Sequence, residues 1–202
     1  MGLTPIGDRS HLPLPVKDVL LAFRRVCAQR RHLRYHAVSD IRALFRRLSA
    51  GVYVVGVTDG EQHDAFTAAW IMQVSFDPLV LALSINPHHA SYPLLKSSGA
   101  FAVSVLKRGH LELARHFGTQ SGRDVDKLAG MRWHPSRAGA PILDEALAYF
   151  GCEVTGSLSA GDHELVLGRV VDGRIVEPDV EPMTYAETGD MDGSSALYPA
   201  RL

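Results

Sequence analysis

The segment Phe66–Pro78 combines residue types that can do chemistry and that are unusual together in a plain strand. Small residues stand there beside Thr67, Trp70, Gln73 and Ser75. Small side chains let a ligand approach the backbone, whose N–H groups can then bond to carbonyl or phosphate oxygens. The hydroxyl groups and the amide add donors and acceptors of both kinds. The segment can therefore hold a flat ligand with polar groups along one edge.

A flavin is one ligand of this kind, because its isoalloxazine ring has a flat apolar surface and several hydrogen-bonding groups along its pyrimidine edge. A half-buried strand with an ordinary polar face accounts for the same residues, and the pattern alone favours that simpler interpretation. Other parts of the chain have to decide between the two.

The usual catalytic signatures are missing. The sequence has no G-x-x-x-x-G-K-[ST] loop, no G-x-G-x-x-G that opens a helix, no H-E-x-x-H and no G-x-S-x-G. Ten histidines suggest a metal site, but His88 and His89 are adjacent and would point in different directions, and no third ligand follows at a diagnostic spacing. We therefore predict no metal site.

The composition is that of an ordinary globular protein. Of 202 residues, 46% are apolar and 21% are charged, and a chain of this length can bury a core without metal or disulfide staples. The formal net charge of −1 creates no global field that would attract nucleic acid or an anionic membrane. We expect small-molecule ligands and neither a nucleic-acid nor a membrane partner.

The sequence also indicates a reducing compartment. Cys27 and Cys152 lie far apart and form no metal-binding or redox motif, so we expect two reduced thiols. The N-terminus lacks the pattern of a signal peptide, and no apolar run approaches the roughly 20 residues that cross a bilayer. These features predict a soluble, cytoplasmic protein.

The hydrophobic pattern predicts a fold that is mainly β with added helices (α+β), organised as a small antiparallel barrel. Period-two and apolar runs predict strands at Val52–Val57, Ala65–Val74, Leu79–Ile85, Phe101–Leu106, Tyr149–Thr155 and His163–Val171. Asp59-Gly60 marks a hairpin turn after the first of them.

Helical spacing predicts short helices at Ala90–Lys96 and Leu111–Phe117. Another helix is expected to begin at Ser39 as N-cap, with one face formed by Ile41, Leu44, Phe45 and Leu48. The polar stretch Gly118–Ala140 is typical of a long excursion around one short helix.

We divide the chain into three parts. Residues 1–38 form an N-terminal arm with a basic amphipathic helix at Val16–Leu33, residues 39–176 form the barrel domain, and residues 177–202 form a tail that we expect to be mostly loop. The basic face of the helix favours packing on the domain or on a partner subunit. Contact with nucleic acid or a membrane is the alternative.

Four stretches of the chain carry a family signature: Phe45–Val55, Phe66–Pro78, Leu94–Leu106 and Gly161–Gly168. Each is weak alone, since short apolar strands are common. Their order and spacing resemble the flavin reductase-like, FMN-binding split-barrel family. The stretch Ala69–Phe76 is similar to a subgroup that includes reductase modules fused to other redox domains. The resemblance implies a split β-barrel that binds FMN.

The resemblance also implies a set of flavin-contacting residues. They are the turn Ser49, Ala50, Gly51 and Val52, the strand Thr67, Ala68, Ala69 and Trp70, the ribityl and phosphate contacts Gln73, Val74 and Ser75, and the loop residues Asn86, His89 and Ser91. Ser91 would contact the phosphate at the start of a helix, where free N–H groups favour anions. Many relatives have Arg or Lys upstream of this serine. This chain has His88 and His89 instead, which could make the contact pH-dependent.

His163, which follows Gly161-Asp162, is the candidate catalytic residue that the resemblance implies. It would orient the flavin or the nicotinamide, because hydride transfer between them needs no strong acid or base. A histidine satisfied by backbone groups at a turn is the alternative. The tail segment Tyr185–Asp190 resembles one that can reach a flavin site in homodimers, although a loose end would look similar.

The resemblance thus implies an enzyme, an NAD(P)H:flavin reductase that binds FMN, or FAD as second choice, at the interface of a homodimer. It would transfer hydride from NADH or NADPH and supply a free flavin pool or a partner oxygenase. A non-catalytic flavin-binding electron carrier is the first alternative. A regulatory domain that contacts DNA through the Val16–Leu33 helix is the second.

Overall fold

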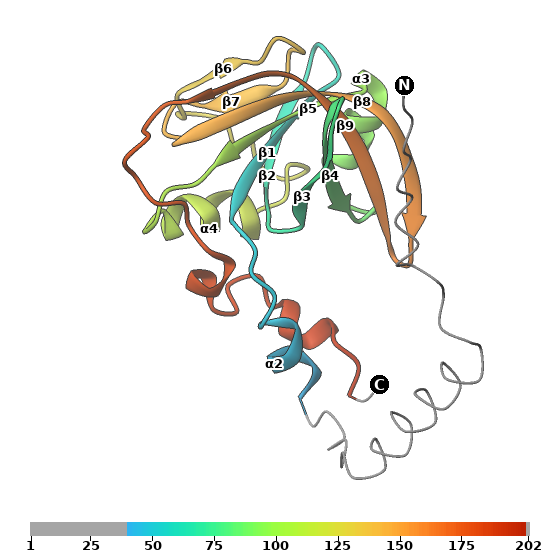
Figure 1. Ribbon diagram of the computed structural model, residues 1–202, viewed down its shortest axis with the longest axis vertical. Helices are drawn as coiled ribbons and strands as arrows, with labels where there is room; N and C mark the ends of the chain where they lie inside the picture. Colours follow the sequence, from blue (N-terminus) through green and yellow to red (C-terminus); the bar gives the residue numbers. More distant parts are fainter. Residues whose placement is uncertain (1–39, 201–202) are drawn as a thin grey trace, which may run out of the picture. The chain divides into compact units, whose positions relative to one another are not determined.

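The computed structural model describes residues 40–200 (Figure 1). In this part the strands form one seven-stranded sheet in the order β2-β1-β5-β8-β9-β4-β3, with antiparallel pairs throughout, and a two-stranded sheet of β6 and β7. The strands are β1 Tyr53–Thr58, β2 His63–Ala68, β3 Ile71–Phe76, β4 Leu79–Ile85, β5 Ala100–Val105, β6 Trp133–Pro135, β7 Pro141–Leu143, β8 Ala148–Ala160 and β9 His163–Ile175. The helices are α2 Ile41–Phe45, α3 Tyr92–Ser98 and α4 Leu111–Thr119, with 3-10 helices η2 Tyr185–Thr188 and η3 Ser194–Leu197.

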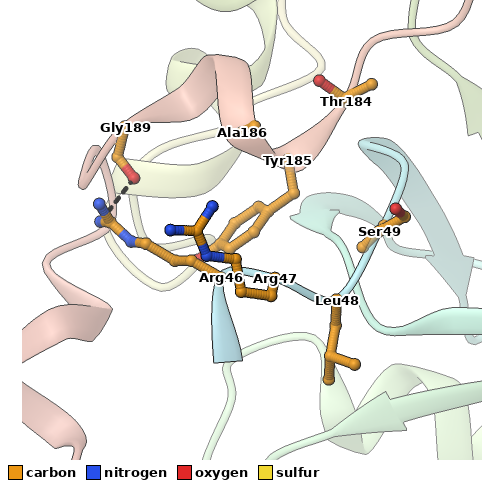
Figure 2. Close-up of a pocket in the computed structure, with 9 residues that line it drawn as sticks. Arg46, Arg47, Leu48, Ser49, Thr184, Tyr185, Ala186 and Gly189 are labelled. Atoms are coloured by element: carbon orange, nitrogen blue, oxygen red, sulfur yellow. Dashed lines mark hydrogen bonds between the residues drawn. The ribbon is translucent and has the colours of Figure 1, made fainter. Parts of the chain in front are cut away.

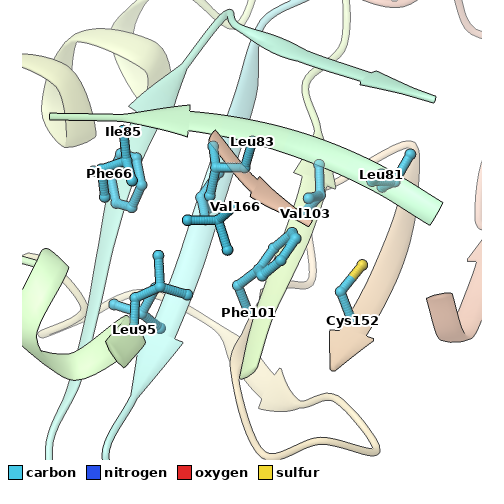
Figure 3. Close-up of a cluster of buried hydrophobic side chains, with 11 residues drawn as sticks. Phe66, Leu81, Leu83, Ile85, Leu95, Phe101, Val103, Cys152 and Val166 are labelled. Atoms are coloured by element: carbon cyan, nitrogen blue, oxygen red, sulfur yellow. The ribbon is translucent and has the colours of Figure 1, made fainter. Parts of the chain in front are cut away.

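Apolar side chains cover both faces of the central strands. Val55 and Val57 of β1 belong to a cluster that also holds Phe101, part of which Figure 3 shows. Val52 and Val54 belong to a second cluster, which contains residues of α4. Because successive side chains of a strand point to opposite faces, a strand that is covered on both sides has an unbroken apolar run. This explains why the β1 and β5 sequences show so little polar alternation.

Most of the predicted strands are confirmed. β4 has the predicted bounds, and β1 and β2 form a hairpin at the predicted Asp59-Gly60 turn. The last two strands are longer than predicted, with 13 residues each. They meet at a tight turn where Gly161 has a φ of 72°, a backbone conformation that favours glycine.

The prediction of one strand from Ala65 to Val74 was wrong. The chain forms β2 and β3 there, interrupted at Ala69 and Trp70. β2 pairs with β1, whereas β3 pairs with β4, so the two strands lie at opposite ends of the sheet order. The sequence has no Gly or Pro at this corner, so no local breaker marks the residue where the first strand ends.

Two predictions about helices also need correction. The N-cap of α2 is Asp40, whose carboxylate accepts the Ala43 N–H at 3.1 Å. Only Ile41 of the expected apolar face is buried; the remaining members are exposed. Residues 120–140 contain turns and β6 but no helix. The buried side chains of Lys127 and Leu128 anchor this loop instead.

The tail follows a defined path through the described residues. Met183 is buried; its carbonyl accepts the Val52 N–H at 3.0 Å and its N–H donates to the Leu106 carbonyl at 2.8 Å. Thr184 and Glu187 form a capping box at the start of η2. The tail is largely irregular, as expected, but backbone hydrogen bonds hold it against the ends of β1 and β5.

Some predictions fall outside the described residues, namely the Val16–Leu33 helix and Cys27; Ser39 also lies there, and the N-cap of α2 that the structure shows is Asp40. Cys152 is a buried free thiol, and burial raises its pKa to about 12. Within residues 40–200, no helix is both long and apolar enough to cross a membrane.

The backbone of β7 lies directly against Gly56 of β1. A Cβ atom at Gly56 would come 2.0 Å from the Pro141 carbonyl oxygen, whereas a Cβ at Gly156 of β8 meets no atom within 4 Å. We expect Gly56→Ala to lower the free energy of unfolding by about 1–3 kcal/mol or more. Gly156→Ala should change it by less than about 0.5 kcal/mol. Urea denaturation measures both; equal midpoints for the two variants would contradict this packing.

Candidate functional site

A cavity of about 240 Å3 opens at the corner between β2 and β3, and we call it the corner cavity. It is lined by Val52, Phe66, Thr67, Ala68, Ala69, Trp70, Ser84, Ile85, Asn86, His89, Gly118, His163, Tyr185, Thr188, Met191, Asp192, Ser194 and Leu197. Strand ends, the loop after β4, the start of β9 and the tail therefore meet at one place. The lining combines apolar side chains with polar ones, and such a combination is typical of small-molecule sites.

The interrupted strand forms one wall of the corner cavity. The Thr67 hydroxyl donates to the Ala114 carbonyl of α4 at 2.7 Å, so it ties the wall to the helix. The Trp70 carbonyl accepts the Ser84 N–H at 3.0 Å. Within residues 40–200, no hydrogen bond uses the N–H groups of Ala69 and Trp70. Two backbone donors beside small side chains are therefore available to a ligand.

His163 lies at the cavity beside Trp70, with 5.0 Å between the ring centroids. Its Nδ1 is 2.9 Å from the Asp162 carboxylate, and this hydrogen bond lowers the pKa of Asp162. A carboxylate only accepts, so we assign the Nδ1 proton to the histidine. The Nε2 atom of neutral His163 is then a hydrogen-bond acceptor.

His89 has the opposite arrangement. Its Nδ1 accepts the backbone N–H of Ser91 at 3.2 Å, so the proton of the neutral ring is on Nε2. Burial lowers the pKa of His89; the positive charges of Lys127 and Arg123 lower it further, against the opposing effect of Asp64. The ring packs on Phe66 with centroids 4.6 Å apart. The cavity is thus lined by one histidine with an Nε2–H donor and one with an Nε2 acceptor.

A buried polar cluster lies behind His89. The Ser91 hydroxyl donates to Asp64 Oδ2 at 2.5 Å, and Lys127 Nζ lies 3.2 Å from Asp64 Oδ1, at an angle too poor for a hydrogen bond. The side chains of Lys127 and Asp64 are 0% and 10% exposed. The Ser91 hydroxyl is therefore used in the hydrogen bond to Asp64, and the Ser91 N–H orients the His89 ring.

The structure brings together eight of the predicted site residues, namely Val52, Thr67, Ala68, Ala69, Trp70, Asn86, His89 and His163. Ser49 and Ala50 line a neighbouring cavity, and Gly51 forms a backbone bridge with Thr184. Gln73, Val74 and Ser75 lie on β3 and do not line the corner cavity of this chain. Ser91 does not line it either.

The resemblance pointed to the tail segment Tyr185–Asp190, but the sequence did not indicate the later tail residues, such as Met191, or that the tail lines the cavity of its own chain. Tyr185, Thr188 and Met191 line the corner cavity from the same chain. The Tyr185 N–H donates to the Ala50 carbonyl at 2.8 Å, and burial raises the pKa of its phenol. A further signal was the T-x-x-E spacing of Thr184 and Glu187, which predicts a helical start in a segment otherwise typical of loop.

The buried Asp64–Lys127 pair should be strongly coupled. Lys127→Met leaves an uncompensated buried carboxylate, and we expect the free energy of unfolding to fall by about 3–5 kcal/mol. The double variant Asp64→Asn/Lys127→Met removes both charges and should recover much of that loss. Urea denaturation of the three proteins measures the difference. Losses that simply add would show that the charges do not interact.

The fold and the sequence have known relatives. A family model described as the flavin reductase-like domain matches residues 45–194. The chain is 31% identical over 140 residues to diflavin flavoprotein A 1 of Synechocystis sp., which covers 69% of this chain and 24% of that protein. The chain thus spans about a quarter of the length of the curated diflavin relatives that it matches.

Two solved structures resemble this one. The NADH:FAD oxidoreductase of Streptomyces globisporus has a TM-score of 0.68 and 29% identity, over 73% of this chain and 88% of that chain. An FMN-binding protein from Thermus thermophilus has a TM-score of 0.63 and 30% identity, over 70% and 79%. The fold is the split β-barrel shared with such proteins, and the family is one of oxidoreductases. The chain belongs to the flavin reductase-like domain family.

Proposed function

We propose that the chain binds FMN in the corner cavity, with FAD as second choice, and that it catalyses hydride transfer from NADH or NADPH to the flavin. The observation that carries this proposal is the interrupted wall at Ala69 and Trp70, where two backbone donors adjoin an apolar surface. An isoalloxazine ring needs both features. The FMN-binding and NADH:FAD relatives support the same ligands.

The residues that line the cavity fit a flavin. Val52, Ile85 and Met191 offer apolar contacts, and the free N–H groups of Ala69 and Trp70 can bond to carbonyl oxygens of the ring. The bound flavin would supply the hydride-accepting ring. The task left to the protein is to align two flat rings and exclude water from between them.

His163 and His89 would orient the ligands. His163 offers an acceptor at Nε2, and His89 offers a donor that stays neutral near pH 7 because its pKa is lowered. Trp70 is 54% exposed, and its ring lies beside His163, where it can cover one side of a bound ring. We propose His163 as the catalytic residue, with an orienting role.

A spectroscopic experiment tests the function. Purified protein is titrated with FMN and with FAD, and the flavin-loaded protein is mixed anaerobically with NADH or NADPH in a stopped-flow spectrometer. We expect a perturbed flavin spectrum and bleaching of the flavin band. A protein that changes neither flavin spectrum would contradict the proposal. Flavin binding without bleaching by either nicotinamide would favour the electron-carrier alternative, which suits relatives where this region is one module.

His163→Ala should slow the bleaching about tenfold, which corresponds to ~1.4 kcal/mol. His134→Ala is the matched control, because His134 also pairs through Nδ1 with a carboxylate, Asp144 at 2.8 Å, but lies outside the cavity. The control should reduce flavin at the wild-type rate. Equal rates for all three proteins would leave His163 without an orienting role.

We also propose a homodimer. β3 is an edge strand of the seven-stranded sheet. Its residues Met72, Val74 and Phe76 are 61%, 47% and 86% exposed. An exposed apolar edge strand invites association. A second copy that covers β3 would bury these side chains, and could bring Gln73 and Ser75 toward the flavin of its partner. A partner oxygenase and a cytoplasmic location stay predictions from the sequence.

The oligomeric state is measured by light scattering after gel filtration. We expect the wild type to be dimeric and Phe76→Glu to be largely monomeric, because the new carboxylate would be buried without a partner. Val125→Glu, at an exposed apolar residue away from β3, is the control and should stay dimeric. A monomeric wild type, or a Phe76→Glu variant that stays dimeric, would contradict the proposed interface.

A further inference from the structure

A second cavity, of about 300 Å3, lies between Arg46–Ala50 and the tail segment Thr184–Gly189. We call it the arginine cavity, and Figure 2 shows the residues that line it. Tyr185 lines both this cavity and the corner cavity. A ligand that extends out of the corner cavity past Tyr185 would therefore reach the arginine cavity.

Backbone hydrogen bonds hold the two walls of the arginine cavity together. The Tyr185 N–H donates to the Ala50 carbonyl at 2.8 Å, and Gly51 and Thr184 form a β-bridge. Within the wall formed by Arg46–Ala50, the Arg47 N–H donates to the Leu44 carbonyl at 3.0 Å. The cavity is thus a built feature of two segments that are distant in the sequence.

The Arg46 guanidinium is used within the protein. It donates to the Gly189 carbonyl at 3.0 Å, the contact dashed in Figure 2, and to Ser195 Oγ at 3.3 Å. It also lies 3.6 Å from the Asp190 carboxylate, which accepts the Ser195 N–H as well. Arg46 and Asp190 therefore offset each other and fix the tail.

Glu187, the other acidic residue near this cavity, already accepts hydrogen bonds within the protein. Glu187 accepts the Thr184 N–H at 2.8 Å and the Thr184 hydroxyl at 3.0 Å in the capping box, and these bonds lower its pKa. The Glu187 carboxylate is negatively charged, and one of its oxygens accepts the backbone N–H at the start of η2. Its negative charge would weaken the attraction of the Arg47 side chain for an anion, but would not abolish it.

Arg47 and Ser49 differ from Arg46 and Glu187 in their contacts. Within residues 40–200, neither side chain takes part in a hydrogen bond or an ion pair, and both line the arginine cavity. In Figure 2 the Arg47 side chain extends without a dashed contact. A guanidinium presents N–H donors in a fork that matches the oxygens of a phosphate, and a hydroxyl adds a further donor.

We propose that the arginine cavity binds a phosphate group of the nucleotide whose ring system lies in the corner cavity, with Arg47 and Ser49 as donors. The proposal rests on the proposed function. It also accounts for a gap in that function, because the Ser91 hydroxyl is committed to buried Asp64. The phosphate can belong to the flavin or to the nicotinamide dinucleotide, which share this chemistry.

The test compares ligands that differ in phosphate. Riboflavin, FMN and FAD are titrated into wild type and Arg47→Gln by flavin fluorescence, and the KM for NADH is measured with the flavin-loaded protein. If the phosphate is the flavin's, we expect Arg47→Gln to weaken FMN or FAD about tenfold and riboflavin less than twofold. If it is the dinucleotide's, the flavin affinities stay unchanged and the KM for NADH rises about tenfold with kcat unchanged.

Two further variants sharpen the test. Arg47→Lys keeps the charge without the fork and should lose less than Arg47→Gln. Arg42→Gln makes the same charge change at an exposed arginine of α2 that does not line the cavity, and it should bind every ligand like the wild type. Circular dichroism melting shows whether each variant is folded.

The proposal would be overturned if Arg47→Gln bound all ligands like the wild type, if riboflavin lost as much affinity as FMN, or if Arg42→Gln had the same effect. These outcomes concern differences between ligands and variants. Failure of the proposed function has a separate sign, which is that the wild type binds no flavin or that its bound flavin is not reduced.

Discussion

The chain leaves the β-ladder at Ala69 and Trp70, and the corner cavity exists because of that interruption. A strand that continued through these residues would commit one of their two N–H groups to a neighbouring strand, because the N–H groups of successive residues point to opposite sides. Instead β2 pairs with β1, β3 pairs with β4, and the backbone between them is free at one point. Backbone groups are obligatory hydrogen-bonding groups, so an interruption beside an apolar wall favours a ligand that can satisfy them.

The other walls are held by interactions that lie outside the cavity. The buried Asp64–Lys127 pair fixes Ser91, and the Ser91 N–H fixes the tautomer of His89. The backbone bonds at Ala50 and Val52 fix the tail, which carries Tyr185 between the two cavities. A rigid surround of this kind reduces the ordering cost of binding a flat ligand.

The sequence was sufficient for the strands that carry a clear period or a turn signal. β4 and the Asp59-Gly60 hairpin follow directly from apolar runs and a glycine. It was insufficient where tertiary pairing decides the outcome. Nothing local marks the corner at Ala69, because no Gly or Pro stands there. The commitment of Ser91 to Asp64 depends on a contact across 27 residues, which no spacing rule predicts. The tail residues after Asp190, such as Met191, were missed for the same reason.

A crystal structure of the protein grown with FMN tests the central claim most directly. The account predicts the isoalloxazine ring in the corner cavity, with its pyrimidine edge at the N–H groups of Ala69 and Trp70 and the ring between His89 and His163. Flavin bound anywhere else, such as on the exposed face of β3 alone, with the Ala69–Trp70 backbone untouched, would contradict it.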